Sequence, residues 1–364
     1  ELDRMKRILA QAMEEGGCGF STGLIYPPGI YADRTEMVEL CKVTARYGGF
    51  FVVHMRNEGD YVLDSIQEVS GICLEAGCPL HISHLKVAGQ KNWGRAGEVL
   101  ALLEEARGKG LDVTFDQYPY IAGSTMLDAV IPPRFHAGGT AKLLERLKNP
   151  AIREEIRQVQ ENIKPERWDN WIDAIGWTNI IVSAVKTDAN RFAEGKSIAE
   201  IAKETGKTPV DAVCDLLIAE ENAVTMVLFY GSEDNVKEIM RSEYMTLCSD
   251  GIVGGKPHPR VYGTCARFLG KYVREEKVLT LPQAIKRMTS FPAQRLALQN
   301  RGLIREGLVA DITIFNPDTI IDKGTYAEPN QYPQGIAYVI VGGQIAVEKG
   351  KITPVRAGRV LRRR

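Results

Sequence analysis

The stretch Phe50-Phe-Val-Val-His54 decides the fold, because it is an apolar run of strand length that ends in an imidazole. Similar runs recur as Leu80-His-Ile-Ser-His84 and Val113-Thr-Phe-Asp116, and each is followed by apolar residues at helical spacing. Further runs of this kind cover Gly19–Leu24, Val224–Tyr230 and Met245–Cys248. Short apolar runs that alternate with helices predict an α/β fold whose parallel strands are buried by helices.

Four of these runs end in a side chain that can bind a metal or move a proton, namely His54, His84, Asp116 and Asp250. In a closed parallel barrel the carboxyl ends of the strands converge on one face, where catalytic groups lie. Imidazole and carboxylate ligands together suit Zn²⁺, with Mn²⁺ or Fe²⁺ as alternatives. The sequence therefore predicts one cation site at this face.

Each of these side chains also has a plain structural interpretation. For His54, a hydrogen-bonded residue at the rim of the sheet is as good an interpretation as a ligand. His84 is favoured as a ligand, because His81 lies three residues earlier and is expected to point to the opposite side of the pleat. Asp250 fits either a helix cap or the acceptor of a proton from metal-bound water. Asp116 fits either the site or a rigid aromatic turn.

Two arginines are candidates for holding a carboxylate group of a substrate. A guanidinium on a loop at the active face binds a carboxylate through paired hydrogen bonds, which favours Arg260 and, as a second candidate, Arg56. His258 lies in the same loop as Arg260, and a position on the surface is an equal alternative for it. His136 falls in a charged central stretch, where we expect it to be exposed. Glycine-rich motifs that cradle phosphates are absent from the sequence.

The composition argues against several classes of protein. Of 364 residues, 46 are Lys or Arg and 46 are Asp or Glu, so the net charge is zero and a nucleic-acid partner is not expected. No apolar run reaches the roughly 18 residues that a membrane span needs. The seven cysteines are scattered, and most are predicted to be buried thiols in a reducing cytoplasm. We therefore expect a soluble, cytoplasmic protein without a membrane partner, and leave homo-oligomerisation open.

The pattern divides the chain into regions. It opens inside a helical pattern without a capping residue, which suggests that upstream sequence is absent. Residues 1–300 carry the βα pattern. They are interrupted at about 130–182 by a charged stretch with three tryptophans, which predicts an inserted lid. Short β runs from Gly302 onward predict a small β domain over 301–364.

Several motifs together resemble the D-aminoacylase (N-acyl-D-amino-acid deacylase) branch of the amidohydrolase superfamily, nearly from end to end. They are Gly19-Phe-Ser-Thr-Gly-Leu-Ile-Tyr-Pro-Pro-Gly29, His54-Met-Arg-Asn-Glu58, Ile82-Ser-His-Leu-Lys86, Asp116-Gln-Tyr-Pro-Tyr120, Ala122-Gly-Ser-Thr125, Ser249-Asp-Gly251, His258-Pro-Arg-Val-Tyr-Gly263 and Gly307-Leu-Val-Ala-Asp-Ile312. The resemblance implies a metal-dependent (β/α)₈ TIM-type barrel, whose first strands are missing here, with a small β domain. It also implies zinc-assisted hydrolysis of an N-acyl-D-amino acid to a carboxylate and a free D-amino acid, with one or two zinc ions in the intact enzyme.

The resemblance also implies roles for individual residues. His84 is similar in position to a metal-binding histidine of the fifth strand. Asp250 resembles the eighth-strand aspartate that takes a proton from the attacking water and passes it to the leaving amine, and it is also a candidate ligand. Arg260 is similar in placement to the arginine that grips the α-carboxylate of the substrate. Tyr118 lies where the family has a sixth-strand histidine, so Asp116 and Tyr118 remain site residues without an assigned role.

Two parts of the family pattern do not occur in the sequence: an HxH pair that ends the first strand and a metal-binding Cys on the second. A sheet without those two strands has unpaired edges and an incomplete ligand set, so we expect this chain alone to bind zinc poorly. Two alternative functions remain. One is a cyclic-amide hydrolase like dihydroorotase or hydantoinase, which usually carries a carboxylated lysine where this chain has His54. The other is a non-catalytic pseudoenzyme barrel.

Overall fold

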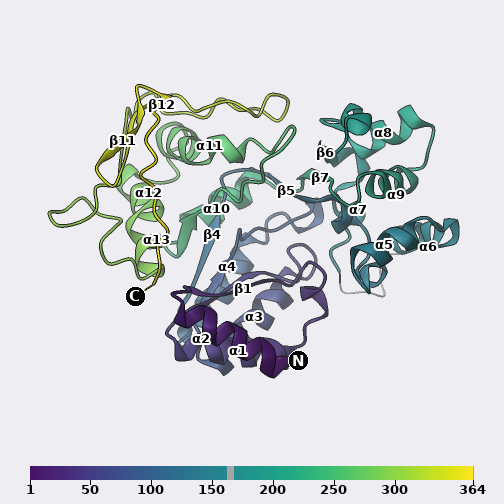
Figure 1. Ribbon diagram of the computed structural model, residues 1–364, viewed down its shortest axis with the longest axis horizontal. Helices are drawn as coiled ribbons and strands as arrows, with labels where there is room; N and C mark the ends of the chain where they lie inside the picture. The colour runs from purple at the N-terminus through teal and green to yellow at the C-terminus, as the bar shows by residue number, and fades with distance from the viewer. Residues whose placement is uncertain (162–167, 364) are drawn as a thin grey trace.

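The computed structural model describes residues 1–161 and 168–363, and within them the largest sheet has five parallel strands (Figure 1). In sheet order the strands are β1 (Gly19–Gly23), β2 (Phe50–His54), β3 (Leu80–Ile82), β4 (Val113–Gln117) and β8 (Met245–Leu247). Their inner residues, such as Phe51, Val53 and Leu80, have no exposed surface. The strands are therefore buried on both faces, as expected of a parallel sheet.

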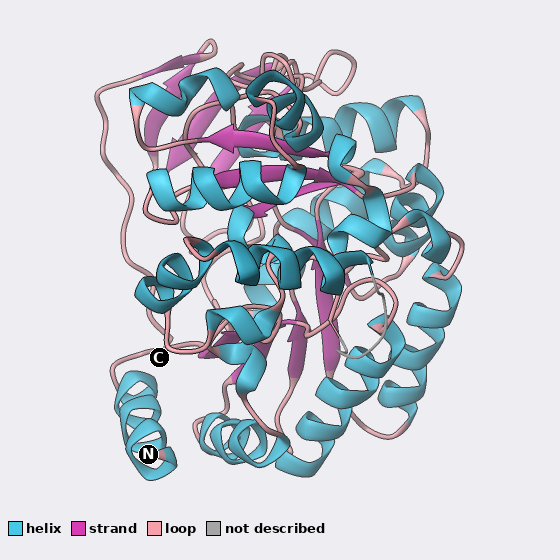
Figure 2. Cartoon of the chain, turned by 90° about the vertical axis from the view of Figure 1, so that its right-hand side faces the viewer, coloured by secondary structure: helices cyan, strands magenta, loops and turns pink. Residues whose placement is uncertain are grey.

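Helices cover this sheet, and Figure 2 shows them along its outer side. The helices are α1 (Leu2–Glu14), α2 (Arg34–Arg46), α3 (Val62–Ala76), α4 (Ala96–Gly108) and α10 (Glu233–Arg241). α2, α3 and α4 each pack against the strand that follows them, α10 packs against β8, and α1 lies beside α2. The alternation of strands and helices predicted from the apolar runs is confirmed for this part of the chain.

A second unit, which we call the helical subdomain, interrupts the parallel sheet between β4 and β8 (Figure 1). It contains a three-stranded antiparallel sheet in the order β5-β7-β6, and helices that share a separate hydrophobic core. Its elements are β5 (Ala122–Met126), α5 (Thr140–Leu147), α6 (Pro150–Glu161), α7 (Trp171–Ile175), β6 (Ile180–Ala184), α8 (Ile198–Thr205), α9 (Pro209–Ala219) and β7 (Thr225–Phe229).

The helical subdomain is larger than the stretch of 130–182 predicted from the sequence. The run Val224–Tyr230 was expected to continue the parallel sheet, and this expectation was wrong, because β7 pairs antiparallel with β5 and β6. An apolar run of five to seven residues fits a parallel and an antiparallel strand equally well. Its pairing partner is decided by long-range contacts that the local pattern does not contain.

The remaining elements follow β8. They are α11 (Arg260–Arg267), a π-helix (Phe268–Glu275), α12 (Leu281–Met288), α13 (Ser290–Arg295), β9 (Ile312–Phe315), β10 (Ile336–Val341), β11 (Gln344–Glu348) and β12 (Lys351–Ile352). The last four strands form an antiparallel sheet in the order β12-β11-β10-β9. The end of the chain then returns to α1, where the Arg363 amide donates to the Gly16 carbonyl over 3.1 Å. Within the described ranges, no helix is both long and apolar enough to cross a membrane.

The pairing of β1 with β2 requires glycine at position 19. A Cβ atom placed on Gly19 would lie 2.1 Å from the carbonyl oxygen of Phe50, a backbone atom that cannot rotate away. We predict that Gly19→Ala lowers the free energy of unfolding by roughly 1–3 kcal/mol, as measured by urea denaturation. Gly108→Ala is the matched control, because nothing lies within 4 Å of the added Cβ on α4. It should leave stability unchanged or raise it by up to about 1 kcal/mol. Equal effects of the two substitutions would contradict this account.

Candidate active site

Two histidines meet at the carboxyl edge of the parallel sheet. His54 is the last residue of β2, and His84 lies in the turn after the neighbouring strand β3. The Nδ1 atom of His54 is 2.5 Å from the Nε2 atom of His84, and the ring centroids are 4.2 Å apart. The structure therefore places His54, for which the sequence left two interpretations, directly against the favoured ligand candidate.

The position of His84 is decided by a turn rather than by strand alternation. β3 ends at Ile82, and His84 has a left-handed backbone with a φ of 39°. Its amide donates to Oδ1 of Asp116 over 2.6 Å, which holds the turn. Non-glycine residues in this conformation occur at sites where the surrounding structure enforces it, and functional sites are enriched in them.

Asp116 lies behind the histidine pair. Besides the His84 amide it binds His81, whose Nε2 is 2.9 Å from Oδ2 of Asp116 and whose Nδ1 is 2.7 Å from the Thr114 hydroxyl. Although burial raises the pKa of the Asp116 carboxyl, hydrogen bonding and charge from His81 lower it to about 2. Asp116 therefore positions His84 as an ionised acceptor, a role that the sequence analysis did not assign to it. His81 is structural, as the sequence predicted.

Glu58 and Lys86 complete the surroundings of His84, and the sequence reasoning missed both. Oε1 of Glu58 is 2.6 Å from Nζ of Lys86 and 3.1 Å from Nδ1 of His84. Burial opposes the charged form of Glu58, but Lys86 and His84 together hold its pKa below the ordinary value. The only sequence signal was their place inside the quoted motifs around His54 and His84.

Asp250 and Arg260 form an ion pair on the opposite side of the same cavity. Nη2 of Arg260 is 2.7 Å from Oδ2 of Asp250. Asp250, like His84, has a left-handed backbone, with a φ of 46°. A cavity of about 30 Å³ is lined by Asp250, His84, Lys86 and Tyr118, and Arg260 lies behind Asp250 and Tyr118 without lining it. Side chains from three separate segments of the chain therefore face one space.

Arg260 is the most deeply buried charged residue of the site. Its side chain is 0% exposed and stacks on the ring of Tyr118 at 4.4 Å, while Nη2 also donates to the Ser124 carbonyl over 3.1 Å. Its Nε and Nη1 atoms have no hydrogen-bond partner within the described part of the chain. Buried donors of this kind are normally satisfied, so two unused N–H directions beside a cavity fit an anionic ligand.

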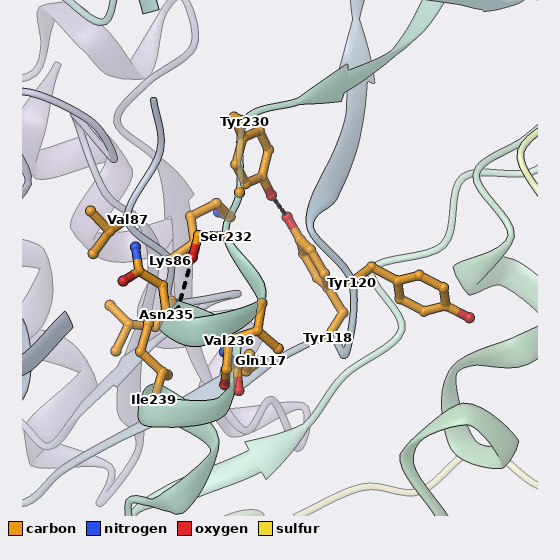
Figure 3. A pocket seen from close by; sticks show the side chains of 12 residues that line it. Lys86, Val87, Gln117, Tyr118, Tyr120, Tyr230, Ser232, Asn235, Val236 and Ile239 are labelled. Atoms are coloured by element: carbon orange, nitrogen blue, oxygen red, sulfur yellow. Dashed lines mark hydrogen bonds between the residues drawn. The ribbon is translucent and has the colours of Figure 1, made fainter. Parts of the chain in front are cut away.

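Tyr118 closes the cavity from the side of the helical subdomain. Figure 3 shows its hydroxyl directed at the hydroxyl of Tyr230, with which it forms a hydrogen bond, while Tyr120 points away. Burial raises the pKa of both Tyr118 and Tyr230 well above the ordinary value, so both hydroxyls stay protonated. Tyr118 is therefore a neutral wall of the site, between Lys86 and Arg260.

The structure also shows where three further residues named in the sequence analysis lie. His258 is fully buried rather than on the surface. Its Nδ1 accepts from the Arg260 amide, and its Nε2 is 2.9 Å from the Ala122 carbonyl. It therefore supports Arg260 and does not line the cavity. Arg56 is also not a cavity residue, because Glu68 and the carbonyls of the loop after β1 use its guanidinium. His136 is buried, where exposure was expected.

The two histidines are suitable ligands for a divalent cation, but a complete metal site needs more ligands than this pair. Burial and the neighbouring His84 lower the pKa of His54 to about 4, so the ring is neutral at physiological pH, as a metal ligand must be. A catalytic zinc site has three protein ligands. Among the residues that the structure describes, no group of three His, Cys, Asp or Glu side chains is placed to hold one ion. The histidine pair therefore supplies only part of a metal site.

Comparison with known proteins shows which proteins this chain is similar to. A model of the amidohydrolase family matches residues 181–347. N-acyl-D-glutamate deacylase of Alcaligenes xylosoxydans is 35% identical over 99% of this chain and 64% of its own length, and D-aminoacylase of the same organism is 32% identical over 100% and 65%. The resemblance to the D-aminoacylase branch of the amidohydrolase superfamily, drawn from the motifs, is confirmed.

A solved structure agrees with this assignment. N-acyl-D-glutamate deacylase of Bordetella bronchiseptica, crystallised with zinc and a phosphonate that mimics the tetrahedral intermediate, superimposes with a TM-score of 0.81 at 32% identity. The match covers 99% of this chain and 66% of that protein. The chain thus spans slightly less than two thirds of the length of these relatives.

Asp169 links the helical subdomain to the loop that carries Glu58. Its carboxylate accepts the amide of Glu58 over 2.5 Å and that of Gly59 over 3.2 Å. Burial raises the pKa of Asp169 to about 7, above its ordinary value of 3.8, while the amide of Glu58 acts to lower it. Between pH 3.8 and about pH 7 the Asp169 carboxyl is more protonated in the folded protein than in the unfolded chain. The stability of the fold therefore decreases as pH rises through this range.

We predict that Asp169→Asn removes this pH dependence. The stability of the variant relative to the native sequence should increase by roughly 2–4 kcal/mol between pH 4 and pH 8, measured by urea denaturation. Asp173→Asn, four residues later on α7, is the control, because the Asp173 carboxylate pairs with Lys91 and not with the amides of Glu58 and Gly59. Parallel pH profiles for Asp169→Asn and the native sequence would show that the Asp169 carboxyl is ionised throughout.

Proposed function

We propose that this protein hydrolyses the amide bond of N-acyl-D-amino acids to a carboxylate and a free D-amino acid. One observation carries the proposal: Arg260 is fully buried, keeps two unpartnered N–H groups, and contacts Asp250 and Tyr118, which line the same cavity as His84. An N-acyl amino acid has one carboxylate for this guanidinium and an amide beside it. The names of the relatives support the substrate class and its D configuration.

The proposed cofactor is Zn²⁺, as one or two ions, because the related structure from Bordetella bronchiseptica was solved with zinc. His54 and His84 would supply imidazole ligands, and at least one ligand beyond this pair is required. When bound, zinc polarises the amide carbonyl and lowers the pKa of a bound water toward neutrality. Glu58 and Lys86, which contact Nδ1 of His84, would fix the orientation of that ring.

The proton transfers in this proposal belong to Asp250. As a general base its carboxylate accepts a proton from the attacking water, whose oxygen forms a bond to the amide carbon. The same carboxyl then delivers the proton to the amide nitrogen as the carbon–nitrogen bond breaks. Arg260 holds the α-carboxylate through the N–H groups that Asp250 does not use, with Tyr118 and Lys86 as the adjoining walls.

The resemblance to the D-aminoacylase branch also suggests how the rest of the chain is arranged. We infer that the five-stranded parallel sheet is part of a closed (β/α)₈ barrel, that residues 301–364 form a small β domain, and that the helical subdomain acts as a lid. The position of the subdomain supports the last inference, because Trp171, Leu228 and Tyr230 line the site cavity together with residues of the parallel sheet edge. The substrate is the only partner proposed.

We predict that Asp250→Asn lowers kcat of the full-length protein by about 10²–10⁴-fold, because the general base is lost. The assay measures the release of free amine from N-acetyl-D-amino acids, with the L-enantiomers in parallel. Asp188→Asn is the control, because the Asp188 side chain is 87% exposed and remote from the cavity. Thermal unfolding of both variants checks that they fold. Native turnover by Asp250→Asn would show that another group transfers the proton.

A further inference from the structure

We propose that a second cavity, next to the active site, binds a bulky apolar substituent of the N-acyl amino acid. This inference rests on the proposed function and names the substrate class more narrowly. The cavity has a volume of about 550 Å³ and lies between the loop after β1 and the helical subdomain. We call it the substituent cavity.

The substituent cavity adjoins the site cavity directly. Ile25, Tyr26 and Ala129 line both spaces. The site cavity, at about 30 Å³, is too small for a large substituent. Any larger group on the substrate must extend elsewhere. A space of several hundred Å³ is the usual size for binding a substituent of many atoms.

Hydrogen bonds across the substituent cavity hold its two walls together. The hydroxyl of Tyr31, on the loop after β1, donates to the Pro133 carbonyl over 2.6 Å. The hydroxyl of Tyr26, on the same loop, is 2.8 Å from that of Thr125 at the end of β5. These contacts fix the loop against the helical subdomain, so the space between them is preformed rather than opened by the ligand.

The lining of the substituent cavity favours apolar groups. Ile25, Pro28, Met126, Ile131 and Trp168 contribute apolar surface. Burying such a group stabilises a complex by about 25 cal/mol per Å² of apolar surface removed from water.

The charges of the substituent cavity disfavour a second carboxylate. Among the described residues that line it none is Lys or Arg, whereas Asp128 lies in its wall. Oδ2 of Asp128 accepts from Asn222 over 2.7 Å and lies 3.9 Å from Nδ1 of His136, whose pKa burial lowers. The neighbouring Arg146 does not line the cavity and donates to the Phe135 and Ala137 carbonyls. A carboxylate here would therefore be desolvated beside another carboxylate. An apolar substituent is therefore preferred over the acidic side chain named for the glutamate-specific relatives.

The test measures dissociation constants by calorimetry on the full-length Asp250→Asn variant, because the native protein is expected to hydrolyse the ligands. The ligands are N-acetyl-D-alanine as reference, N-octanoyl-D-alanine, N-acetyl-D-phenylalanine and N-acetyl-D-glutamate. We expect N-octanoyl-D-alanine or N-acetyl-D-phenylalanine to bind at least 10-fold more tightly than the reference, and N-acetyl-D-glutamate no more tightly than the reference. Preference for the octanoyl compound places the acyl chain in the substituent cavity, and preference for the phenylalanine compound places the side chain there.

A variant that fills the cavity separates this inference from a general preference for apolar ligands. Thr140 is exposed at the start of α5 and lines only the substituent cavity, so Thr140→Trp fills the space without disturbing a core. It should reduce the 10-fold preference to about 2-fold or less. Thr313→Trp, at an exposed position of β9, is the control and should keep the preference.

The outcomes distinguish the two proposals. Equal binding of all four ligands, tighter binding of the glutamate compound, or an unchanged preference in Thr140→Trp would overturn the substituent cavity and leave the deacylase function standing. Failure of every ligand to bind would contradict the proposed function, and the assignment of the cavity with it.

Discussion

A guanidinium group without exposed surface is the constraint on which the site depends. Removing Arg260 from water is costly unless its N–H groups find partners, and the structure supplies these only in part. The Nη2 atom of Arg260 contacts both Asp250 and the Ser124 carbonyl, and the ring of Tyr118 stacks on the guanidinium group. His258 accepts a hydrogen bond from the backbone amide of Arg260. The two remaining nitrogens, Nε and Nη1, have no hydrogen-bond partner among the described residues.

The parallel sheet explains why the other site residues lie near this group. Neighbouring parallel strands end at one edge, so β2 and β3 bring His54 and His84 within hydrogen-bond distance of each other. The turn after β3 then depends on Asp116, and the loop after β2 depends on Asp169 of the helical subdomain. The reactive edge is thus supported from behind by the sheet and from the side by the subdomain. The substituent cavity lies along this second boundary.

Local sequence patterns were sufficient to locate the elements that depend on residues close together in the sequence. Apolar runs located the parallel strands, and polar residues at their ends pointed to His84 and Asp250. The same patterns gave the wrong sheet for Val224–Tyr230 and could not decide whether His258 is buried, because pairing and burial depend on contacts more than 100 residues apart. Glu58 and Lys86 were missed because a charged residue after a strand is common, and only the fold shows that the two contact one histidine.

The most direct test of the central claim concerns the charge of the ligand and not its turnover. The dissociation constant of an N-acetyl-D-amino acid is compared with that of its primary amide, which has nearly the same shape and no charge. If the unused N–H groups of Arg260 bind the carboxylate, the acid should bind about 10–150-fold more tightly than the amide, the range expected for hydrogen bonds between charged groups. Arg260→Gln should abolish this difference. Equal affinity for the acid and the amide in the native protein would contradict the account.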